Sequence, residues 1–247
     1  SGQFLIRQGC SALYTCPMNQ LVHSKTSKAA QPLVVKEAGR TNDPARTMAE
    51  ILAVATHEFA DKGLTGARID AIAAATRTSK RMIYYYFGSK DGLYLAVLEE
   101  AYRRMRAIEA DLHLDDLVPM AALRKLVEFT YDHHRDNEDF IRLVMNENIQ
   151  RGDYLRQSKN IQALNSNAIQ SVRSVYERGL GQGVFRAGLD PVDIHSAISA
   201  FTFFNVSNRH TFGVIFQDRV SVDKANTLKR EHVVELILRF VSHSVSA

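Results

Sequence analysis

Apolar residues recur every three or four positions along most of the chain, which is the spacing of one buried face of an α-helix. In the first such run, Asp43 and Pro44 have the residue types of an N-cap and a first helical position. Thr47, with Glu50 three residues later, matches a capping box, and Gly63 is a stop signal. The apolar face of this predicted helix consists of Ile51, Leu52, Val54, Ala55 and Phe59.

Two shorter helices are predicted next, one around Ile69 to Ala73 and one over residues 80–87, which Thr78 or Ser79 can cap. The second has two different faces. One face is polar and consists of Lys80, Arg81, Tyr84 and Tyr85, and the other is apolar and consists of Met82, Ile83, Tyr86 and Phe87. An ordinary amphipathic surface helix would have the same two faces. With the two preceding helices, however, the pattern fits a helix-turn-helix, whose second helix enters the major groove of DNA.

The rest of the chain continues the helical pattern, so the predicted class is all-α. Further helices are expected over residues 89–112, 120–134, from 136, over 157–178, from 190, and around Val233 to Val241. Asp115, Asp116 and Pro119 break the pattern, and glycines at 179–183 indicate a turn. A brief extended piece, Val184 to Arg186, is the one exception we expect.

Several residues of the second and third helices are similar to the DNA-binding domain of the TetR family of bacterial transcriptional regulators. They are Ile72-Ala73, Ser79 and Tyr84-Tyr85-Tyr86-Phe87-Gly88-Ser89-Lys90. The resemblance covers about Ala45 to Leu98. The chain departs from it at Thr76-Arg77-Thr78, where the family often has Ala-Gly-Val, and at Arg81-Met82, where Gly-Thr is common. The first departure puts a simple glycine-mediated turn in doubt, and the second implies a different base preference.

The resemblance implies a DNA-binding head over residues 44–90 and a larger helical effector-binding and dimerisation domain over residues 91–247, which loosely resembles the RutR-like branch. The residues expected to hold the operator, a double-stranded DNA site, are Arg68, Thr78, Ser79, Lys80, Arg81, Tyr84, Tyr85 and Lys90. Lys80 and Arg81 are expected to read bases, and Tyr84, Tyr85, Lys90 and Arg68 to reach phosphates. The charge distribution agrees with DNA binding at this end of the chain. Residues 1–43 and residues 44–90 each carry a net charge of +3, whereas the rest of the chain carries −2.

TetR-like proteins are homodimers that pair through their last two helices, and two apolar stripes suit that role. The expected interface consists of Ile194, Ile198, Phe201, Val234, Ile237, Phe240 and Val241. The resemblance also implies a pocket for a small-molecule effector of unknown identity. Its candidate residues are His133, His134, Phe140, Met145, Asn148, Tyr154, Phe203, Asn205 and His210. For each of them, ordinary core packing or a solvated helix end is the alternative interpretation.

Other functions find little support in the sequence. No Gly-x-Ser-x-Gly, P-loop or His-Glu-x-x-His motif is present, so we expect no enzyme, no cofactor and no metal site. Cys10 and Cys16 make no metal-ligand pattern and fit a reducing compartment, and no apolar run is long enough for a membrane span. Residues 1–43 are interpreted as a mobile arm.

The predicted function is a ligand-responsive transcriptional repressor that a small molecule releases from its operator. We expect it in the bacterial cytoplasm, associated with the nucleoid when it is bound to DNA. Two alternatives remain: an architectural DNA-binding protein without an effector, and a helical protein-interaction module.

Overall fold

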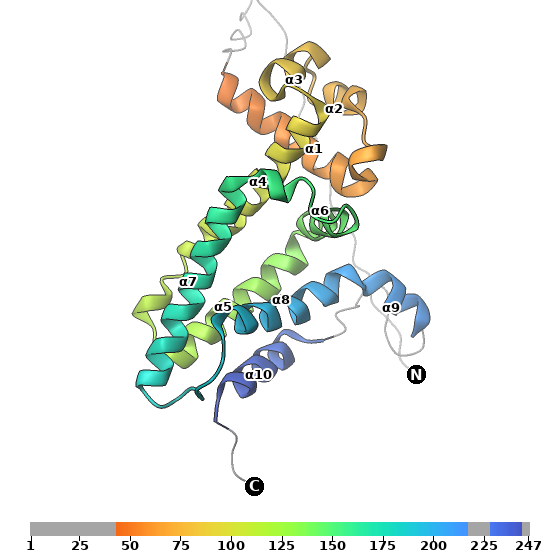
Figure 1. Ribbon diagram of the computed structural model, residues 1–247. Coiled ribbons are helices and arrows are strands. Elements are labelled where there is room, and N and C mark those ends of the chain that lie inside the picture. The colour runs from red at the N-terminus through yellow and green to blue at the C-terminus, as the bar shows by residue number, and fades with distance from the viewer. Residues whose placement is uncertain (1–42, 217–227, 244–247) are drawn as a thin grey trace, which may run out of the picture. The chain divides into compact units, whose positions relative to one another are not determined.

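A computed structural model of the chain describes residues 43–216 and 228–243, so the predicted mobile arm lies outside the described residues except for Asp43. The described residues form ten α-helices and two short 3-10 helices with no strand among them, which confirms the all-α class (Figure 1). None of these helices is long and apolar enough to cross a membrane. The bounds are α1 Pro44–Gly66, α2 Ile69–Ala75, α3 Lys80–Phe87, α4 Lys90–Ala110, η1 Leu114–Asp116, α5 Pro119–Asp136, α6 Glu138–Ile149, η2 Leu155–Gln157, α7 Lys159–Gly181, α8 Pro191–Ser207, α9 Arg209–Ile215 and α10 Arg230–Val241.

Polar side chains begin four of these helices where the sequence predicts a start. The carboxylate of Asp43 accepts hydrogen bonds from two backbone N–H groups of the first turn of α1, at 3.0 and 3.2 Å. The hydroxyls of Ser79 and Ser89 accept from N–H groups three residues further on, at 3.2 and 2.9 Å, and Asp190 caps α8 at 2.8 Å. Each cap satisfies a backbone donor that the helix itself leaves unpaired.

Local expectations fail at two places in the N-terminal region. The capping box does not form, because Thr47 donates its hydroxyl to the Asp43 carbonyl (3.0 Å) while Glu50 pairs with Arg46 (3.0 Å). Gly63 has a φ of +65°, which interrupts the regular helix as expected, but a short helical turn continues to Gly66.

Two further expectations fail near the C-terminal end. Residues 184–186 form no strand. Instead Phe185 is buried beneath Gly179, where an added Cβ would lie 1.9 Å from the ring. The helix from 190 stops at Ser207, and α9, which the sequence pattern did not predict, follows it.

The first core lies among α1, α2, α3 and the start of α4. Its most completely buried side chains include Ile51, Phe59, Ile72 and Ile83. Leu143 of α6 belongs to the same apolar cluster. A division of the chain at residue 90 would therefore cut a shared core, and the two-domain boundary stays a prediction.

A second core lies among α5, α7, α8 and α10. Five of the residues predicted for the subunit interface belong to it and are at most 1% exposed: Ile194, Ile198, Val234, Ile237 and Val241. They face their own chain, since the α8 and α10 stripes pack on α5 and on each other. Phe201 and Phe240 are partly buried at the edge of this core.

Candidate DNA interface and effector site

The recognition helix α3 separates the two faces that the sequence predicts. Ile83 is fully buried in the first core, whereas Tyr84 and Tyr85 are 44% and 77% exposed. Lys80 and Arg81 are exposed on the first turn of the helix. Two cations and two phenols therefore share one outer surface of α3. The two cations lie in its first turn, which is the part of the second helix that reads base edges in a helix-turn-helix.

Asp70, at the start of α2, binds two of the cations predicted to contact DNA. Its carboxylate forms an ion pair with the Lys80 ammonium and lies 3.7 Å from Nη2 of Arg68. These groups are roughly half exposed or more, so we expect the pairs to add little stability. This role of Asp70 could not be predicted from local patterns, because the contact forms across the turn between α2 and α3.

The other predicted DNA-contacting residues differ in how free their side chains are. The Lys90 ammonium donates to the Thr65 carbonyl at 3.4 Å, and the Ser79 hydroxyl is occupied as the cap of α3. Thr78 is partly buried in the turn. Arg81, in contrast, has no hydrogen bond or ion pair with any residue of 43–216 or 228–243.

Four of the nine predicted effector residues come together inside the second half of the chain. His134 is 4% exposed, with its ring stacked on Phe140 at 6.0 Å and edge-on to Phe203 at 6.3 Å. His133 lies beside the same Phe140 ring at 5.6 Å. Burial, reinforced by the nearby charges of His133 and Arg106, lowers the pKa of His134 to about 3. The imidazole is therefore neutral at physiological pH.

A buried ion pair completes this cluster, and no pattern in the sequence marks it as buried. Arg106 and Glu109 of α4 pair with side chains only 10% and 7% exposed, and Arg106 also donates to Asn165 Oδ1 at 2.9 Å. The positive charge of Arg106 also lowers the pKa of His133 and His195, after burial itself. Within the described residues, Nδ1 of His133, Nδ1 of His134 and Nε of Arg106 are buried without a hydrogen-bond partner.

Three of the remaining predicted effector residues lie elsewhere. Asn148 is exposed and donates to the Val144 carbonyl, while Tyr154 packs edge-on against Tyr94 at 5.1 Å. Asn205 is buried, and its side-chain amide binds both backbone groups of Leu228, at 2.9 and 3.3 Å, which fixes the chain two residues before α10.

Met145 and His210 line a separate cavity of about 350 Å³ beside the end of α1. Met145 also packs against the apolar cluster that contains Phe140 and Phe203, whereas His210 lies at the surface beside Glu138.

A cavity of about 440 Å³ reaches the histidine cluster from the surface. Its inner wall includes His133 and Phe140, which also belong to the buried cluster. Its outer walls come from α1, through Ala53 and Thr56, and from α4, through Arg104. One space therefore touches both the DNA-binding helices and the interior of the second half of the chain.

Comparison with known proteins agrees with this arrangement. Residues 51–97 match the family described as bacterial regulatory proteins, tetR family, and residues 119–237 match the tetracyclin repressor-like C-terminal domain. The HTH-type transcriptional repressor NicS of Pseudomonas putida is 37% identical over 176 residues, covering 71% of this chain and 83% of NicS. The chain belongs to the TetR family. The prediction of a ligand-responsive, DNA-binding repressor is thereby confirmed at the level of the family.

Two more distant similarities fit the same assignment. RutR of Escherichia coli is 32% identical over 93 residues, which cover 38% of this chain and 43% of RutR. Among solved structures, the Streptomyces coelicolor protein SCO4942 superposes with a TM-score of 0.60 at 25% identity, covering 79% of this chain and 98% of that one. The curated relatives are transcriptional regulators, and no group of residues with metal-ligand geometry occurs in the described part of this TetR-family chain.

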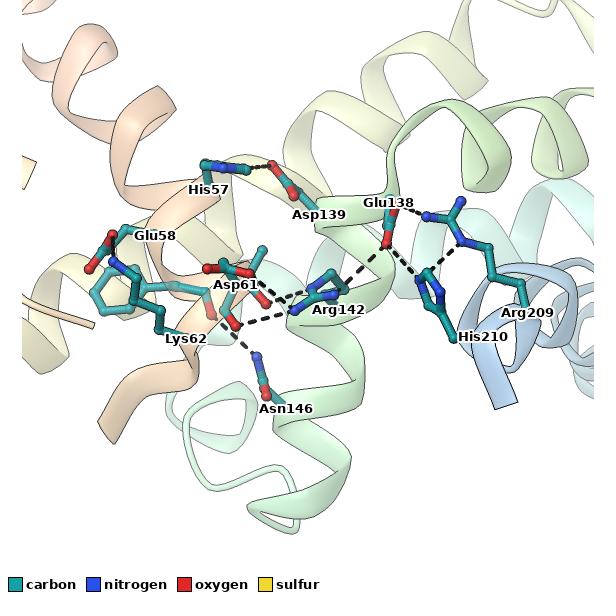
Figure 2. Close-up of polar contacts among 12 residues, drawn as sticks. His57, Glu58, Asp61, Lys62, Glu138, Asp139, Arg142, Asn146, Arg209 and His210 are labelled. Atoms are coloured by element: carbon teal, nitrogen blue, oxygen red, sulfur yellow. Dashed lines mark hydrogen bonds and ion pairs between the residues drawn. The ribbon is translucent and has the colours of Figure 1, made fainter. Parts of the chain in front are cut away.

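Polar contacts join α6 to the end of α1, as Figure 2 shows. Arg142 donates from Nε to the Ala60 carbonyl at 2.9 Å and from Nη2 to the Asp61 carbonyl at 3.2 Å. Asn146 donates to the Phe59 carbonyl at 3.3 Å. These carbonyls lie just before the interruption at Gly63, so α6 side chains bind the end of the first part of α1.

Glu138 extends this set of contacts, which we term the α1–α6 junction, to α9. Its carboxylate pairs with Arg209 and lies 3.8 Å from His210 Nε2 and 3.9 Å from Arg142 Nη1. On the other side of the junction, His57 of α1 lies 3.4 Å from Asp139 (Figure 2). The start of α6 is thus connected to the DNA-binding helices and to α9 by charged groups. Both Glu138 and Asp139 also line the cavity that reaches His133.

Proposed function

We propose that this TetR-family protein is a homodimeric repressor that leaves its operator when a small molecule occupies the cavity beside His133. The observation that carries the proposal is the composition of the cavity wall. Ala53 and Thr56 belong to α1, whereas His133 and Phe140 belong to α5 and α6. A ligand in this cavity contacts α1 and the α5–α6 region at once. Its affinity therefore depends on how the DNA-binding head is placed relative to α5 and α6. That dependence is what allows a ligand to shift a conformational equilibrium.

The lining indicates the chemistry of the ligand. His133 and Phe140 are the aromatic residues of the cavity wall, and behind them Tyr102 lies edge-on to Phe140 while Phe129 lies beside His133. Nδ1 of His133 has no partner among the described residues and offers a hydrogen bond, because a neutral imidazole has one donor and one acceptor. The charged residues of the wall pair with neighbouring side chains: Glu100 with Arg104, Asp136 with Arg135, Glu138 with Arg209, and Asp139 with His57. The charge of Arg106 is balanced by Glu109, so the interior does not require a compensating charge. We therefore propose a small, flat, aromatic effector that carries hydrogen-bonding heteroatoms.

We propose that the effector signal passes through the α1–α6 junction. Arg142 and Asn146 hold the last carbonyl groups of the first part of α1, and the cavity opens against both helices. A ligand that moves the start of α6 would therefore move the end of α1. This movement would change the distance between the two recognition helices of a dimer and so release the operator.

On the DNA side, we propose that Arg81 reads bases together with Lys80, which must exchange its Asp70 partner for DNA. Tyr84, Tyr85, Arg68 and Lys90 would contact phosphates, with Ser79 and Thr78 shaping the start of α3. Because such a regulator acts on the chromosome, we place it in the bacterial cytoplasm, on the nucleoid when bound. No observation favours catalysis or a purely architectural role.

We propose a dimer interface on the outer faces of α8 and α10. The predicted residues on the inner faces are covered by the same chain, but Val192 and Phe204 of α8 and Leu236 of α10 are 48%, 38% and 42% exposed. Ser196 and Ala200 lie between the first two at a spacing of four residues and are exposed. Small side chains at this spacing let two helices approach closely, as in a four-helix bundle.

Thermal stabilisation tests the effector proposal. A panel of small aromatic compounds is screened against the full chain, and compounds that raise Tm are tested for release of bound DNA. A ligand at 100 times its Kd stabilises by about 2.7 kcal/mol. We expect His133→Leu to lose both responses and Asn148→Ala, at an exposed site away from the cavity, to keep them. Equal responses in the two variants would reject this cavity as the effector site.

A further inference from the structure

The turn between the two helices of the helix-turn-helix contains an arginine in a glycine conformation. Arg77 has a φ of +52°, in the left-handed region. Its N–H donates to the Ala74 carbonyl at 3.3 Å, and the N–H of Thr78 donates to the Ala73 carbonyl at 3.1 Å. This pair of hydrogen bonds is the Schellman motif that ends a helix, and Arg77 occupies the position at which glycine is usual.

This arrangement explains how the turn forms without glycine. The sequence departs from the common family pattern at Arg77, yet the backbone adopts the left-handed conformation that glycine would adopt without strain. A residue with a Cβ is strained in this region. Arg77 thus destabilises the fold locally, and nothing in the packing of the turn compensates, because its side chain is exposed.

The Arg77 side chain has no charged partner in the part of the chain that the structure describes, unlike most cations of the DNA-binding head. Arg68 and Lys80 share the carboxylate of Asp70, and Lys90 donates to a backbone carbonyl. Of the lysines and arginines in residues 43–90, only Arg77 and Arg81 have side chains without a hydrogen bond or ion pair to a described residue. Arg81 is already assigned to the groove. Arg77 is the other cation whose charge is fully available to a polyanion.

We propose that Arg77 contacts the phosphate backbone of DNA beside the recognition helix. The inference rests on the proposed function, in that the helix-turn-helix faces DNA. Residues at the start of the recognition helix reach base edges, while the preceding helix crosses the sugar-phosphate backbone. Arg77 lies between the two, three residues before Lys80. A guanidinium there can grip a phosphate through two N–H groups. The contact fixes position on the duplex and is indifferent to sequence.

The strained backbone makes the proposal unusually testable, because one substitution should move stability and DNA binding in opposite directions. Arg77→Gly removes both the charge and the strain. We expect Tm to rise by roughly 2 to 4 °C. We expect affinity for a labelled duplex of mixed sequence to fall roughly tenfold or more for a dimer, with the slope of log affinity against log salt shallower by about 2.

The chain supplies a matched control in Arg151. It has a φ of +58° and ends α6 with the same two hydrogen bonds, from its own N–H to Asn148 and from Gly152 to Glu147. Arg151→Gly should raise Tm similarly and leave both the affinity and the salt slope unchanged. Arg77→Lys should keep the wild-type Tm and most of the affinity, since it retains the charge in the same conformation.

The outcomes separate this inference from the proposed function. If the wild-type protein bound no duplex, the proposed function would fail. If the wild-type protein binds and Arg77→Gly binds equally well with the same slope, the phosphate contact is rejected. A lower Tm in Arg77→Gly would also overturn it, because Arg77 would then hold the turn together. A loss confined to one preferred sequence would assign Arg77 to base reading instead.

Discussion

The buried histidines beside the cavity predict a specific dependence of stability on pH. Burial lowers the pKa of His134 to about 3, whereas the same group in the unfolded chain keeps a value near 6.5. The unfolded state therefore takes up a proton that the folded state excludes. The sign follows from this: the stability contributed by neutral His134 is complete above pH 6.5 and is lost as pH falls below it. His133 and His195 act in the same direction, since burial lowers their pKa too.

The magnitude follows from the two pKa values of His134. At about pH 5, roughly thirty unfolded molecules are protonated at this site for each neutral one, while the folded site stays almost entirely neutral. The free energy of unfolding is therefore lower by about 2 kcal/mol than at about pH 7.5 on account of His134 alone. The hydrogen bond from Arg135 lowers the pKa of Asp136, whose contribution to stability is lost only at still lower pH.

Urea unfolding of the full chain at the two pH values, at one protein concentration, measures this difference. His134→Gln should abolish about 2 kcal/mol of the pH dependence. Asn148→Ala, an exposed substitution that removes no titratable group, should leave the dependence at its wild-type value. If His134→Gln retained the full pH dependence, the imidazole would be able to charge in place, and the neutral interior proposed for the effector site would be wrong.

Three other substitutions test the head, the junction and the dimer. Arg142→Ala should lower the free energy of unfolding by about 1 to 2 kcal/mol, as judged by urea unfolding, and uncouple effector binding from DNA release. Asp70→Asn frees Arg68 and Lys80, so affinity for mixed-sequence DNA should increase and its salt slope steepen, with Tm nearly unchanged. Leu236→Asp should give a folded monomer by light scattering and circular dichroism. Weaker nonspecific DNA binding by Asp70→Asn would contradict the role given to Asp70. Effector-driven DNA release at the wild-type level in Arg142→Ala would contradict the role of the α1–α6 junction. A dimer that persists in Leu236→Asp would contradict the proposed interface.

The DNA-binding head was largely predictable because its signals are local. Caps such as Ser79 act over three residues, and the two faces of residues 80–87 follow from helical geometry alone. The left-handed backbone of Arg77 could not be predicted, and the sequence shows only that an arginine stands where glycine is common in the family. The partner of Lys80 was not visible, since Asp70 reaches it across a turn whose geometry the sequence does not reveal.

The body of the protein was predicted less well, because apolar stripes do not say what covers them. Ile198 and Val234 have the pattern expected of an interface, yet they pack inside their own chain. Arg106 and Glu109 resemble an exposed pair at a spacing of three, but neighbouring helices bury them. Only the tertiary arrangement of α4, α5 and α8 distinguishes such a pair from a solvated one.

Selection of bound sequences from random DNA by the full chain shows whether this protein is a sequence-specific, dimeric repressor. We expect enrichment of one site with two inverted half-sites, as a two-fold dimer requires. We also expect that an aromatic compound which stabilises the wild-type protein removes the protein from that site. Recovery of DNA without any preferred sequence, or a site that no stabilising compound releases, would contradict a ligand-responsive repressor.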